Sequence, residues 1–569
     1  MRNTNVPASI CLAGLLGATA FAGNAPLDVI LASGTAAPGT ESGTKFVSFM
    51  APVTSDAGTF AFVGNLSSAT QSTGIWVGTS GNWTMLAREG QSLSGGFGTL
   101  KSLFTSVVTF NSTGQVAFSA RSGSGDGTLR VFRASQSLGV QVVASVGQQA
   151  PGLAIGVTFR DFGDPVINAS GQISFSASLQ GPGITSSNQG SVWLYSAGVL
   201  LPVLKGGDIP NISQPTTTVR ELMLPLLNGS GKLAFGGVLQ GPLIAPINES
   251  ARWTATNWVP SLQIVGGTLI PLAEDGGGYI VRRVLPGMHR MNSSGTIVFF
   301  ADHDDALAVP KFAHSIWLSS SNTILPVVTR TTPLQAFGEP LGVSAFSSAV
   351  LDAIGNVHFK ATVTGSQVKT ETDHGFFTRF SNGSVVQRFR AGQAAPGVAG
   401  ARQTFELSPY SAVGPQGELF LSAPLKGFIP GARYDRVLFT NYPDGSSSKV
   451  IATGDSILVN GQSKTVAAIG NYYMGNGQDG LASSINSAGQ FVFRLQFTDN
   501  SWAIVRNQLR ALCPGDFNGD RFVDDEDFSY FAAYYDAFVS GPGDLDHNGS
   551  CDDADFVRFA QSYTSLVCP

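Results

Sequence analysis

The sequence predicts an all-β fold, a β-propeller of about eight four-stranded blades, followed by a small α-helical domain. A unit of one tight turn and one strand, typified by NASGQISFSASL at residues 168–179, recurs along the chain. A repeat of fixed period determines the architecture before any local pattern does. Successive turn glycines lie 56 to 72 residues apart, which is room for about four strands of five or six residues. Helical periodicity is absent from the repeats.

The repeat occurs in eight copies, and each has a turn glycine. Five copies begin with asparagine, at Asn111, Asn168, Asn228, Asn292 and Asn486. Three looser copies begin at Ser55, Asp352 and Gly414. Glycine supplies the positive φ of the turn, and Asn or Asp is expected to cap it through its side chain. The turn glycines are Gly58, Gly114, Gly171, Gly231, Gly295, Gly355, Gly417 and Gly489.

Aromatic residues recur in phase with these turns. Residues that recur once per blade are expected to pack between neighbouring sheets. One set follows the turn glycine, at Phe62, Phe118, Phe175, Phe235, Phe299, Phe359 and Phe493. A second set lies on the next expected strand, at Trp76, Phe132, Trp193, Trp317, Phe377 and Phe439.

The two ends of the repeat array complement each other. After the eighth copy, only residues 501–506 offer a further strand, so the last repeat lacks its fourth. Residues 26–39 form a fourth-strand sequence that no motif precedes. We therefore expect the N-terminal strand to complete the last sheet, because closing the ring removes exposed strand edges. A seven-bladed ring or a split array stays an alternative, since two looser copies could be irregular.

The first residues have the pattern of a secretory signal peptide. Arg2 precedes an apolar run over residues 8–21, and Ala20-Phe21-Ala22 forms a small-residue cleavage site. We expect a signal peptide at residues 1–22, a propeller domain at 23–510 and a C-terminal domain at 511–569. No later run is long enough to cross a membrane. The sequence thus predicts a secreted, extracellular protein, and its net charge of −5 argues against a nucleic-acid partner.

Two acidic loops in the C-terminal domain have the ligand spacing of calcium-binding EF-hand loops. Oxygen-bearing side chains fall at positions 1, 3, 5, 9 and 12, with a backbone carbonyl at position 7. We expect calcium as the cofactor. The predicted ligands of the first loop are Asp516, Asn518, Asp520, Phe522 through its carbonyl, Asp524 and Asp527. Those of the second are Asp544, Asp546, Asn548, Ser550 through its carbonyl, Asp552 and Asp555.

Each loop precedes an apolar stripe at helical spacing, so two helices are expected to pack together. The stripes are Phe528, Phe531, Ala532 and Tyr535, and then Phe556, Phe559, Ala560 and Tyr563. Disulfides persist outside the cytoplasm. Cys513 and Cys568 bracket the domain and form the expected disulfide, with Cys551 buried between the loops. A Cys513–Cys551 pair is the alternative.

The duplicated loop and helix resemble a type I dockerin, in particular the Cys-bracketed kind at the C-termini of exported planctomycete-like bacterial proteins. The resemblance implies a calcium-dependent attachment module whose partner in cellulosome systems is a cohesin. Arg521 replaces the glycine expected at position 6 and should weaken the first calcium site. In type I dockerins, the residues just before the last calcium ligands recognise the cohesin. Here those positions hold Asp525-Glu526 and Asp553-Ala554, which depart from the family's pattern, so another cell-surface protein is an alternative partner.

The repeats resemble tandem-repeat proteins named for an N-x-x-G-x-x-A-F motif and found with interchangeable C-terminal anchors. That resemblance implies no activity. The propeller sequence contains no G-x-S-x-G, H-E-x-x-H or P-loop motif, and we predict no catalytic residue. Asp302-His303-Asp304-Asp305 and Asp373-His374 could form a metal site or an acid/base pair, but we interpret them as solvated loop charge.

We therefore expect a propeller that binds an extracellular ligand, either a glycan or a protein, and is anchored by the calcium module. One alternative is a carbohydrate-active enzyme, a glycoside hydrolase or lyase that degrades polysaccharide. Its carboxylates would come from distant blades and leave no local motif. The other alternative is a structural surface or adhesion protein.

Overall fold

The chain was analysed as a computed structural model. It describes residues 27–68, 72–101, 103, 107–209, 216–246, 248–271, 278–305, 313–320, 323–329, 332, 334–336, 339–370, 372–398, 403–404, 407–408, 411–425, 436–443, 445–509, 515–516, 523–535, 543, 545 and 551–565.

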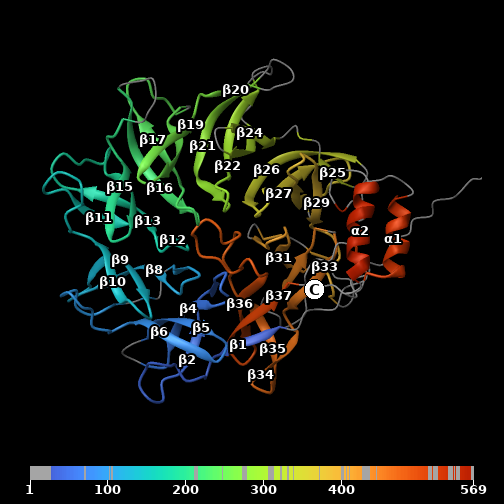
Figure 1. Cartoon of the computed structure of the whole chain (residues 1–569), viewed down its shortest axis with the longest axis horizontal. Coiled ribbons are helices and arrows are strands. Elements are labelled where there is room, and N and C mark those ends of the chain that lie inside the picture. Colours follow the sequence, from blue (N-terminus) through green and yellow to red (C-terminus); the bar gives the residue numbers. More distant parts are fainter. Residues whose placement is uncertain are drawn as a thin grey trace, which may run out of the picture.

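Eight antiparallel sheets form a ring around a central axis (Figure 1). The predicted eight-bladed propeller is confirmed, and the seven-bladed and split arrangements are wrong. We number the blades in chain order. In each blade the strand just before the motif strand is the inner one, and the motif strand, the aromatic strand and the outer strand follow outward. Blades 5, 6 and 8 have a further strand before the inner one.

The strands of the first four blades are as follows. Blade 1 contains β2 (Phe46–Phe49), β3 (Val53–Thr54), β4 (Phe60–Leu66), β5 (Thr73–Thr79) and β6 (Asn82–Arg88). Blade 2 contains β7 (Thr109–Phe110), β8 (Val116–Ser122), β9 (Thr128–Ser135) and β10 (Gly139–Ser145). Blade 3 contains β11 (Thr158–Phe162), β12 (Val166–Ile167), β13 (Ile173–Gln180), β14 (Gly190–Ser196) and β15 (Val199–Lys205). Blade 4 contains β16 (Thr218–Leu227), β17 (Leu233–Gln240), β18 (Ser250–Thr256) and β19 (Val259–Val265).

The second half repeats this plan. Blade 5 contains β20 (Leu269–Pro271), β21 (Gly278–Met291), β22 (Ile297–Asp305), β23 (Ala313–Ser320) and β24 (Thr323–Val328). Blade 6 contains β25 (Leu334–Ala336), β26 (Glu339–Leu351), β27 (Val357–Thr364), β28 (His374–Arg379) and β29 (Val385–Arg390). Blade 7 contains β30 (Ser411–Val413), β31 (Leu419–Pro424), β32 (Arg436–Asn441) and β33 (Ser447–Ala452). Blade 8 contains β34 (Ser456–Val459), β35 (Gln462–Ile469), β36 (Gln490–Phe497), β37 (Trp502–Gln508) and β1 (Asp28–Ala32).

The N-terminal strand closes the ring as predicted. β1 pairs antiparallel with β37, and Asp28 lies opposite Arg506. The Arg506 Nη2 atom also lies 2.5 Å from Asp28 Oδ2, which adds an ion pair to the strand pairing. The first and last parts of the propeller thus form one sheet, and no open edge remains between blades 8 and 1.

The hydrophobic core lies between neighbouring sheets. One cluster joins Val63 and Ile75 of blade 1 to Phe118 and Phe132 of blade 2, and similar clusters recur around the ring. The two aromatic sets pair across adjacent strands, as where Phe118 stacks on Phe132 with ring centroids 5.3 Å apart. Every residue of both sets is at most 1% exposed, so the predicted packing role is confirmed.

The inner strand of blade 3 is interrupted. The stretch before the motif of blade 3 forms two short strands, because β11 ends at Phe162 and β12 begins at Val166. Pro165 has no N–H to donate to a ladder, and a Cβ on Gly163 would lie 2.5 Å from Ser176 Oγ. The gap turns Asp164 away from the ladder, at the inner edge of blade 3.

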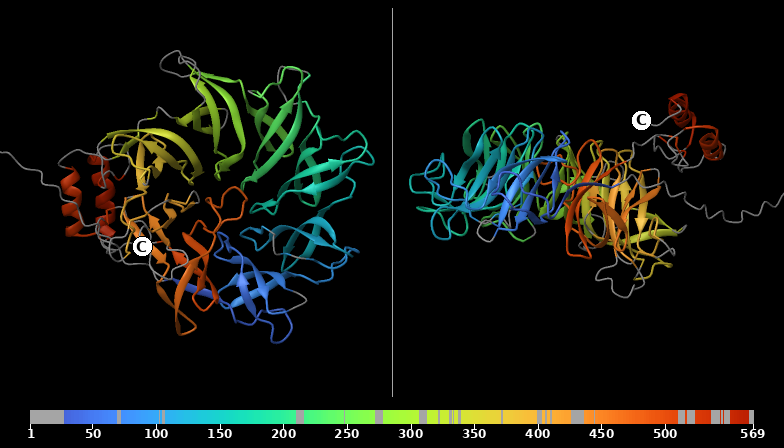
Figure 2. Two further views of the ribbon diagram at one scale, coloured as in Figure 1. Left: turned by 180° about the vertical axis from the view of Figure 1, so that it is seen from behind. Right: turned by 90° about the horizontal axis from the view of Figure 1, so that it is seen from below.

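Two helices, α1 (Asp525–Tyr535) and α2 (Asp553–Ser565), lie beside the ring (Figure 2). They pack through Phe531 and Phe559, whose stacked rings have centroids 4.9 Å apart. The predicted helix pair is therefore present. Neither helix, within the residues the structure describes, is long and apolar enough to span a membrane.

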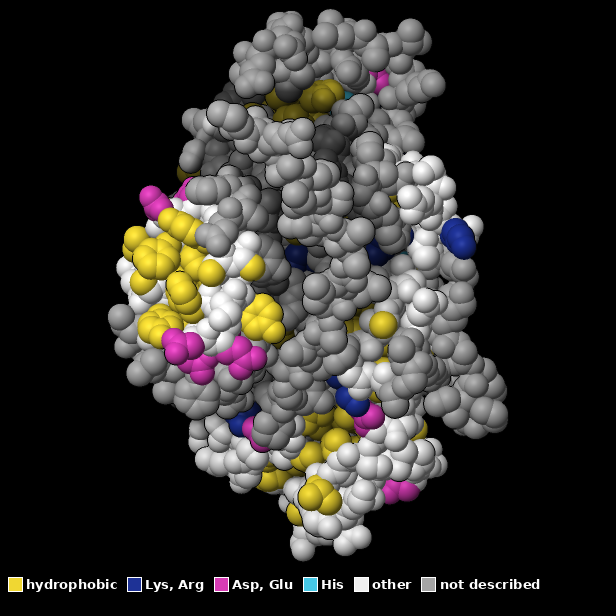
Figure 3. All heavy atoms as spheres, turned by 90° about the vertical axis from the view of Figure 1, so that its right-hand side faces the viewer, with side chains coloured by type: hydrophobic (Ala, Val, Ile, Leu, Met, Phe, Trp, Pro, Cys, Tyr) yellow, Lys and Arg dark blue, Asp and Glu magenta, His cyan; other side chains and the backbone are white. Residues whose placement is uncertain are grey.

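The helix pair exposes part of its apolar stripe. Phe528 and Phe556 are 44% and 43% exposed, although the stripe pattern predicted that they would be buried. Tyr530 and Val557 are exposed as well. Figure 3 shows hydrophobic side chains gathered beside acidic ones on this side of the molecule. Each helix packs against the other on one face alone, so part of each apolar stripe stays exposed to solvent.

Candidate functional site: the centre of the ring

A relay of asparagine side chains surrounds the axis. Asn168 Oδ1 accepts hydrogen bonds from the backbone N–H groups of Ser170 and Gln172, which confirms the predicted turn cap. Its Nδ2 group donates to the next blade. The inter-blade bonds run from Asn111 to the Asn168 carbonyl oxygen at 2.9 Å, Asn168 to Asn228 at 3.0 Å, Asn228 to Ser293 at 3.1 Å, Asn292 to Asp352 at 3.4 Å, and Asn486 to Ser55 at 2.9 Å.

Close packing of neighbouring turns adds a second reason for the turn glycines. Gly171 and Gly231 both have positive φ, at 75° and 82°. A Cβ on Gly171 would lie 2.6 Å from Gln115 Oε1 of the preceding blade, and one on Gly231 would lie 2.8 Å from Gln172 Oε1. A side chain at either position would have to displace the end of the neighbouring glutamine side chain, in addition to the strain of a positive φ.

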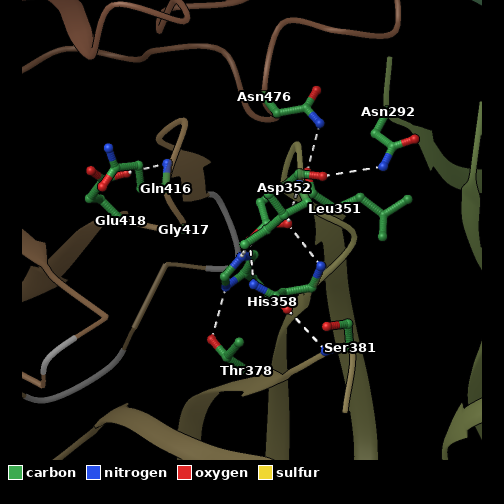
Figure 4. Close-up of polar contacts among 12 residues, drawn as sticks. Asn292, Leu351, Asp352, His358, Thr378, Ser381, Gln416, Gly417, Glu418 and Asn476 are labelled. Carbon is green, nitrogen blue, oxygen red and sulfur yellow. Dashed lines mark hydrogen bonds and ion pairs between the residues drawn. The ribbon is translucent and has the colours of Figure 1, made fainter. Parts of the chain in front are cut away.

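A buried ionic network stands beside the looser motif of blade 6 (Figure 4). The Asp352 carboxylate accepts from Asn356 Nδ2 at 2.8 Å and from His358 Nε2 at 3.1 Å. The Thr378 hydroxyl lies 2.9 Å from His358 Nδ1. Burial alone would raise the pKa of Asp352, but these hydrogen bonds lower it overall, and burial lowers the pKa of His358. The pair is therefore an ionised carboxylate that accepts from a neutral imidazole.

This network connects blade 6 to blade 7, where the motif begins with Gly414 and has no side chain to contribute. Arg388 on β29 donates to the Gly417 carbonyl oxygen at 3.2 Å and to Asn441 Oδ1 at 2.9 Å. The buried arginine thus replaces the asparagine relay at a junction where the motif has diverged.

Residues 470–485, which we call the plug, occupy the middle of the ring. They leave blade 8 after β35 and return to it before β36; Figure 1 shows the segment in orange-red inside the ring. The plug hydrogen-bonds to the residue that immediately precedes the repeat motif in several blades. These bonds join Gly475 to Val413, Asn476 to Leu351, Asp479 to Leu227, Gly480 to Ile167 and Ser483 to Thr54.

The order of these contacts shows the path of the plug. Along the plug, they fall on blades 7, 6, 4, 3 and 1, and the Gln478 side chain accepts from the Ser293 backbone N–H of blade 5. The plug therefore makes almost a full circuit of the axis, in the direction opposite to the blade order. The plug thus contacts the inner strands close to the motif turns.

A cavity in two chambers remains beside the plug. The first chamber, of about 460 Å³, lies against the inner strands of blades 2 to 5 and includes Asp164, His289 and Arg290. The second, of about 630 Å³, lies against blades 7, 8 and 1 and includes Arg436 and Arg494. Tyr472 and Tyr473 of the plug line both chambers.

The ionisable groups of the cavity are shifted by their surroundings. Burial raises the pKa of Asp164. Burial also raises the pKa of Tyr473, and the neighbouring Asp164 raises it further. Burial lowers the pKa of Arg494. Leu224 beside the first chamber has φ at 49°, and its carbonyl oxygen lies 3.0 Å from His289 Nε2. Perturbed titratable groups and a non-glycine positive φ in one concavity are typical of functional sites.

The two polar clusters singled out in the sequence do not line this cavity. Asp302, His303 and Asp304 lie on β22, where they are 6%, 4% and 4% exposed. Asp302 pairs with Arg283 at 2.9 Å, and Asp304 pairs with Arg282. The interpretation as solvated loop charge is therefore wrong, because strand pairing buries these groups and arginines neutralise them.

The second cluster is also a local pair. His374 begins β28, and its Nδ1 atom lies 3.4 Å from Asp373 Oδ1 and 3.2 Å from Thr362 Oγ1. Asp305 ends β22 and also lies in a strand. Neither cluster gathers enough facing carboxylates to form an acid/base pair within the described part of the chain.

The structure describes part of the predicted calcium site. Asp524 and Asp552 precede the two helices, and their Oδ1 atoms accept from the backbone N–H groups of Glu526 and Ala554. Asp527 and Asp555 are fully buried, and Asp516 is partly buried. The other predicted ligands lie outside the described residues: Asn518, Asp520, Phe522, Asp544, Asp546, Asn548 and Ser550.

The predicted disulfide also falls outside the described residues, since Cys513 and Cys568 do. Cys551 is buried as expected, in a cluster with Val523, Phe531 and Phe559, and its Sγ atom lies 3.1 Å from the Gly543 carbonyl oxygen.

Sequence reasoning did not find the plug or its cavity. One signal was present, because the last turn spacing, Gly417 to Gly489, is the longest at 72 residues. The extra residues are glycine-rich, with two tyrosines, and have neither strand alternation nor a known motif. The cavity side chains come from seven blades and the plug, so no local spacing connects them.

Comparison with solved structures finds many chains at low identity. A prolyl endopeptidase matches with 11% identity and a TM-score of 0.39, over 80% of this chain and 55% of that one. The β-propeller domain of a trilobed protease from Pyrococcus furiosus matches with 8% identity and a TM-score of 0.34, over 71% and 96%. An ulvan lyase, from a new family of polysaccharide lyase, matches with 10% identity and a TM-score of 0.29, over 70% and 90%.

This chain thus spans little more than half the length of the endopeptidase. No curated protein matches it. A family of unknown function, DUF7453, matches residues 16–224 and again residues 214–508. The two matches together span the propeller and end where the helical domain begins. Because they cover most of the sequence, the chain belongs to the DUF7453 family.

Proposed function

We propose that this protein is exported, binds an extracellular saccharide in its central cavity, and is attached through its calcium-binding C-terminal domain. The observation that carries the proposal is the cavity itself: two chambers beside the plug, both lined by Tyr472 and Tyr473.

The shape and lining of the cavity suit a saccharide. Each chamber has the size of a small-ligand pocket, and a concave site with a few convergent polar groups is the usual form of such sites. Tyrosine offers an apolar ring face together with a hydroxyl, which matches the alternating faces and hydroxyls of a sugar. Ser408, Ser422 and Asn471 add hydrogen-bonding groups to the second chamber. A protein ligand would instead need an extended exposed surface.

The cavity favours binding over hydrolysis. A glycoside hydrolase uses two carboxyl groups on opposite sides of the scissile bond. Asp164 is the one carboxylate among the described residues that line the chambers. Asp479 lies behind the first chamber, where it is 2% exposed and its Oδ2 atom stands 4.0 Å from Arg290 Nη1. The described lining therefore has groups that recognise a ligand, but not the two carboxyl groups that a glycoside hydrolase uses.

The attachment role is supported by the helix pair. Asp527 and Asp555, at position 12 of the predicted loops, are buried carboxylates at the start of the two helices. Buried carboxylates need a cation or hydrogen-bond donors to offset desolvation, so they fit a calcium ion. The exposed Phe528 and Phe556 offer an apolar surface for a cohesin-like or other cell-surface protein.

The test is a binding and cleavage assay on a polysaccharide panel. The full-length chain is incubated with soluble and insoluble polysaccharides, and both its depletion from solution and the release of reducing ends are measured. We expect depletion without release. Tyr473→Ala should weaken binding, because it removes the ring shared by both chambers. Tyr530→Ala, on the exposed face of α1, is the matched control and should bind normally.

Other outcomes separate the alternatives. Release of reducing ends would identify a carbohydrate-active enzyme and direct attention to Asp164. Absence of binding to every polysaccharide would contradict the proposal and favour a structural or adhesion protein.

A further inference from the structure

We infer that the second chamber recognises the acidic group of its saccharide, a carboxylate or a sulfate. The inference rests on the proposed function and specifies the class of ligand. It follows from an imbalance of charge: Arg436 and Arg494 line this chamber, and none of its described lining residues is Asp or Glu. Two guanidinium groups in a concave, partly desolvated space attract an anion strongly.

Arg494, on β36 of blade 8, is held in place by contacts with blades 1 and 8. Its Nη1 atom donates to the Phe49 carbonyl oxygen of blade 1, and its guanidinium carbon lies 5.0 Å from the centre of the Trp502 ring. Its Nε atom is buried, and it has no hydrogen-bond partner in the described part of the chain. The guanidinium of Arg494 is thus held in one orientation, while its buried Nε–H donor lacks an acceptor among those residues. An anionic oxygen of a ligand can accept this hydrogen bond.

Arg436 is anchored on the adjacent blade 7. Its Nη1 atom donates to Ser422 Oγ at 3.1 Å, and its backbone N–H donates to Thr453 Oγ1 at 3.0 Å. Ser422 and Thr453 also line the chamber. The planar guanidinium has five N–H donors, so donors beyond the one on Ser422 are available for a carboxylate or sulfate.

Each arginine stands near one of the two plug tyrosines. The charge of Arg436 acts on the Tyr472 hydroxyl, and the charge of Arg494 acts on that of Tyr473. A sugar ring against a tyrosine therefore has a cation beside it. The first chamber differs, because Asp164 lies there with Arg290 and His289. The acidic group is thus expected on the blade 7, 8 and 1 side, and neutral sugar units on the other side.

The test compares acidic and neutral oligosaccharides by titration calorimetry on the full-length chain. The probes are trigalacturonate, a sulfated galactan trisaccharide and neutral galactotriose. We expect at least one acidic probe to bind about tenfold or more tightly than galactotriose, with an affinity that falls as salt is added. Arg436→Gln should weaken acidic binding roughly ten- to a hundredfold and weaken galactotriose binding much less.

Arg494→Gln tests the same chamber independently and should also weaken binding of the acidic probe. The melting temperature of this variant shows whether it is still folded. Arg160→Gln is the matched control, because Arg160 is exposed on β11 and lies outside both chambers. A preference for one acidic probe would identify carboxylate or sulfate as the group recognised.

Equal affinity for acidic and neutral probes would overturn the inference but leave the proposed function standing. An equal loss of both kinds of binding in Arg436→Gln would also overturn it, since the residue would then act through the fold. No binding of any probe by the wild-type chain, together with no binding in the polysaccharide panel, would overturn the proposed function and the inference with it.

Discussion

Asn168 donates from its side-chain amide to the backbone carbonyl oxygen of Asn228, its counterpart one blade later, at 3.0 Å. The same residue caps its own turn through Oδ1. One side chain therefore fixes the turn of its own blade and joins that blade to the next. Only an amide can do both, because aspartate has no donor and serine is too short. The five blades that keep asparagine are the ones from which such a bond extends.

Replacing Asn168 by aspartate should destabilise the propeller. Asn168→Asp keeps the turn cap but places a buried carboxylate against the Asn228 carbonyl oxygen, and Asn168 is 3% exposed. We expect a loss of about 1–3 kcal/mol in the free energy of unfolding, measured with urea at neutral pH. Asn82→Asp, at an exposed position on β6, is the control. Equal effects of the two changes would show that the relay does not stabilise the ring.

The plug should tolerate no side chain at Gly480. Gly480 has φ at 76°, and a Cβ there would lie 2.6 Å from the Leu227 carbonyl oxygen. Gly461 in the β34–β35 hairpin has φ at 78° but no atom within 4 Å of a Cβ. Both alanine variants carry the left-handed backbone cost of about 1–2 kcal/mol. Gly480→Ala should lose about 1–3 kcal/mol more in urea unfolding, because the plug must move from blade 4.

If Gly461→Ala and Gly480→Ala lose the same stability, the plug is loosely held and its circuit of the axis contributes little. That result would also weaken the view that the plug fixes the shape of the cavity.

Arg252 should be replaceable by an apolar residue with a gain in stability. It is 0% exposed, its guanidinium carbon lies 4.5 Å from the centre of the Phe299 ring, and its side-chain nitrogens have no hydrogen-bond partner among the described residues. Burial lowers the pKa of Arg252 to about 9. We expect Arg252→Met to raise the free energy of unfolding by about 1–4 kcal/mol. A loss of stability in thermal unfolding would mean that the cation is compensated.

The Asp352–His358 pair should make stability depend on pH. Burial lowers the pKa of His358 from 6.5, so below that pH the unfolded chain binds a proton that the folded chain does not. Stability should therefore fall as pH falls below 6.5, until the folded pKa is reached. Asp352, whose pKa is also lowered, adds a loss below 3.8. In His358→Gln the first decline should be shallower, as urea unfolding between pH 7.5 and 5 would show. Parallel profiles in the two proteins would contradict the assignment.

Features that depend on a local sequence pattern could be predicted, whereas contacts between residues far apart in the chain could not. The turn glycines, the aromatic pairs and the strand of residues 28–32 repeat a local pattern, so they revealed the blades and the closure of the ring. The inter-blade bond of Asn168 has no local trace, because its acceptor lies 60 residues away. The turn-cap role of asparagine was visible in sequence, but its second role was not.

The candidate site was missed for the same reason. Asp164, Arg436 and Tyr473 belong to different blades and the plug, and only the fold brings them together. Asp302 and Asp304 were wrongly predicted to lie in a loop, because charged residues in an apolar chain usually do. Ion pairs with Arg283 and Arg282 on the neighbouring strand let both carboxylates lie in a sheet. The helices were predictable because each follows a complete twelve-residue loop pattern.

Calcium removal should affect the helices and leave the propeller folded. A chelator should abolish the helical circular-dichroism signal, because buried Asp527 and Asp555 would face each helix start without a cation. The two loops should differ, since Arg521 occupies position 6 of the first loop where Gly549 occupies it in the second. Calcium titration should therefore lose the tighter binding step in Asp555→Ala and the weaker step in Asp527→Ala. Loss of the propeller's strand signal on chelation would show that the two parts do not fold independently, whereas an unchanged helical signal would refute calcium dependence.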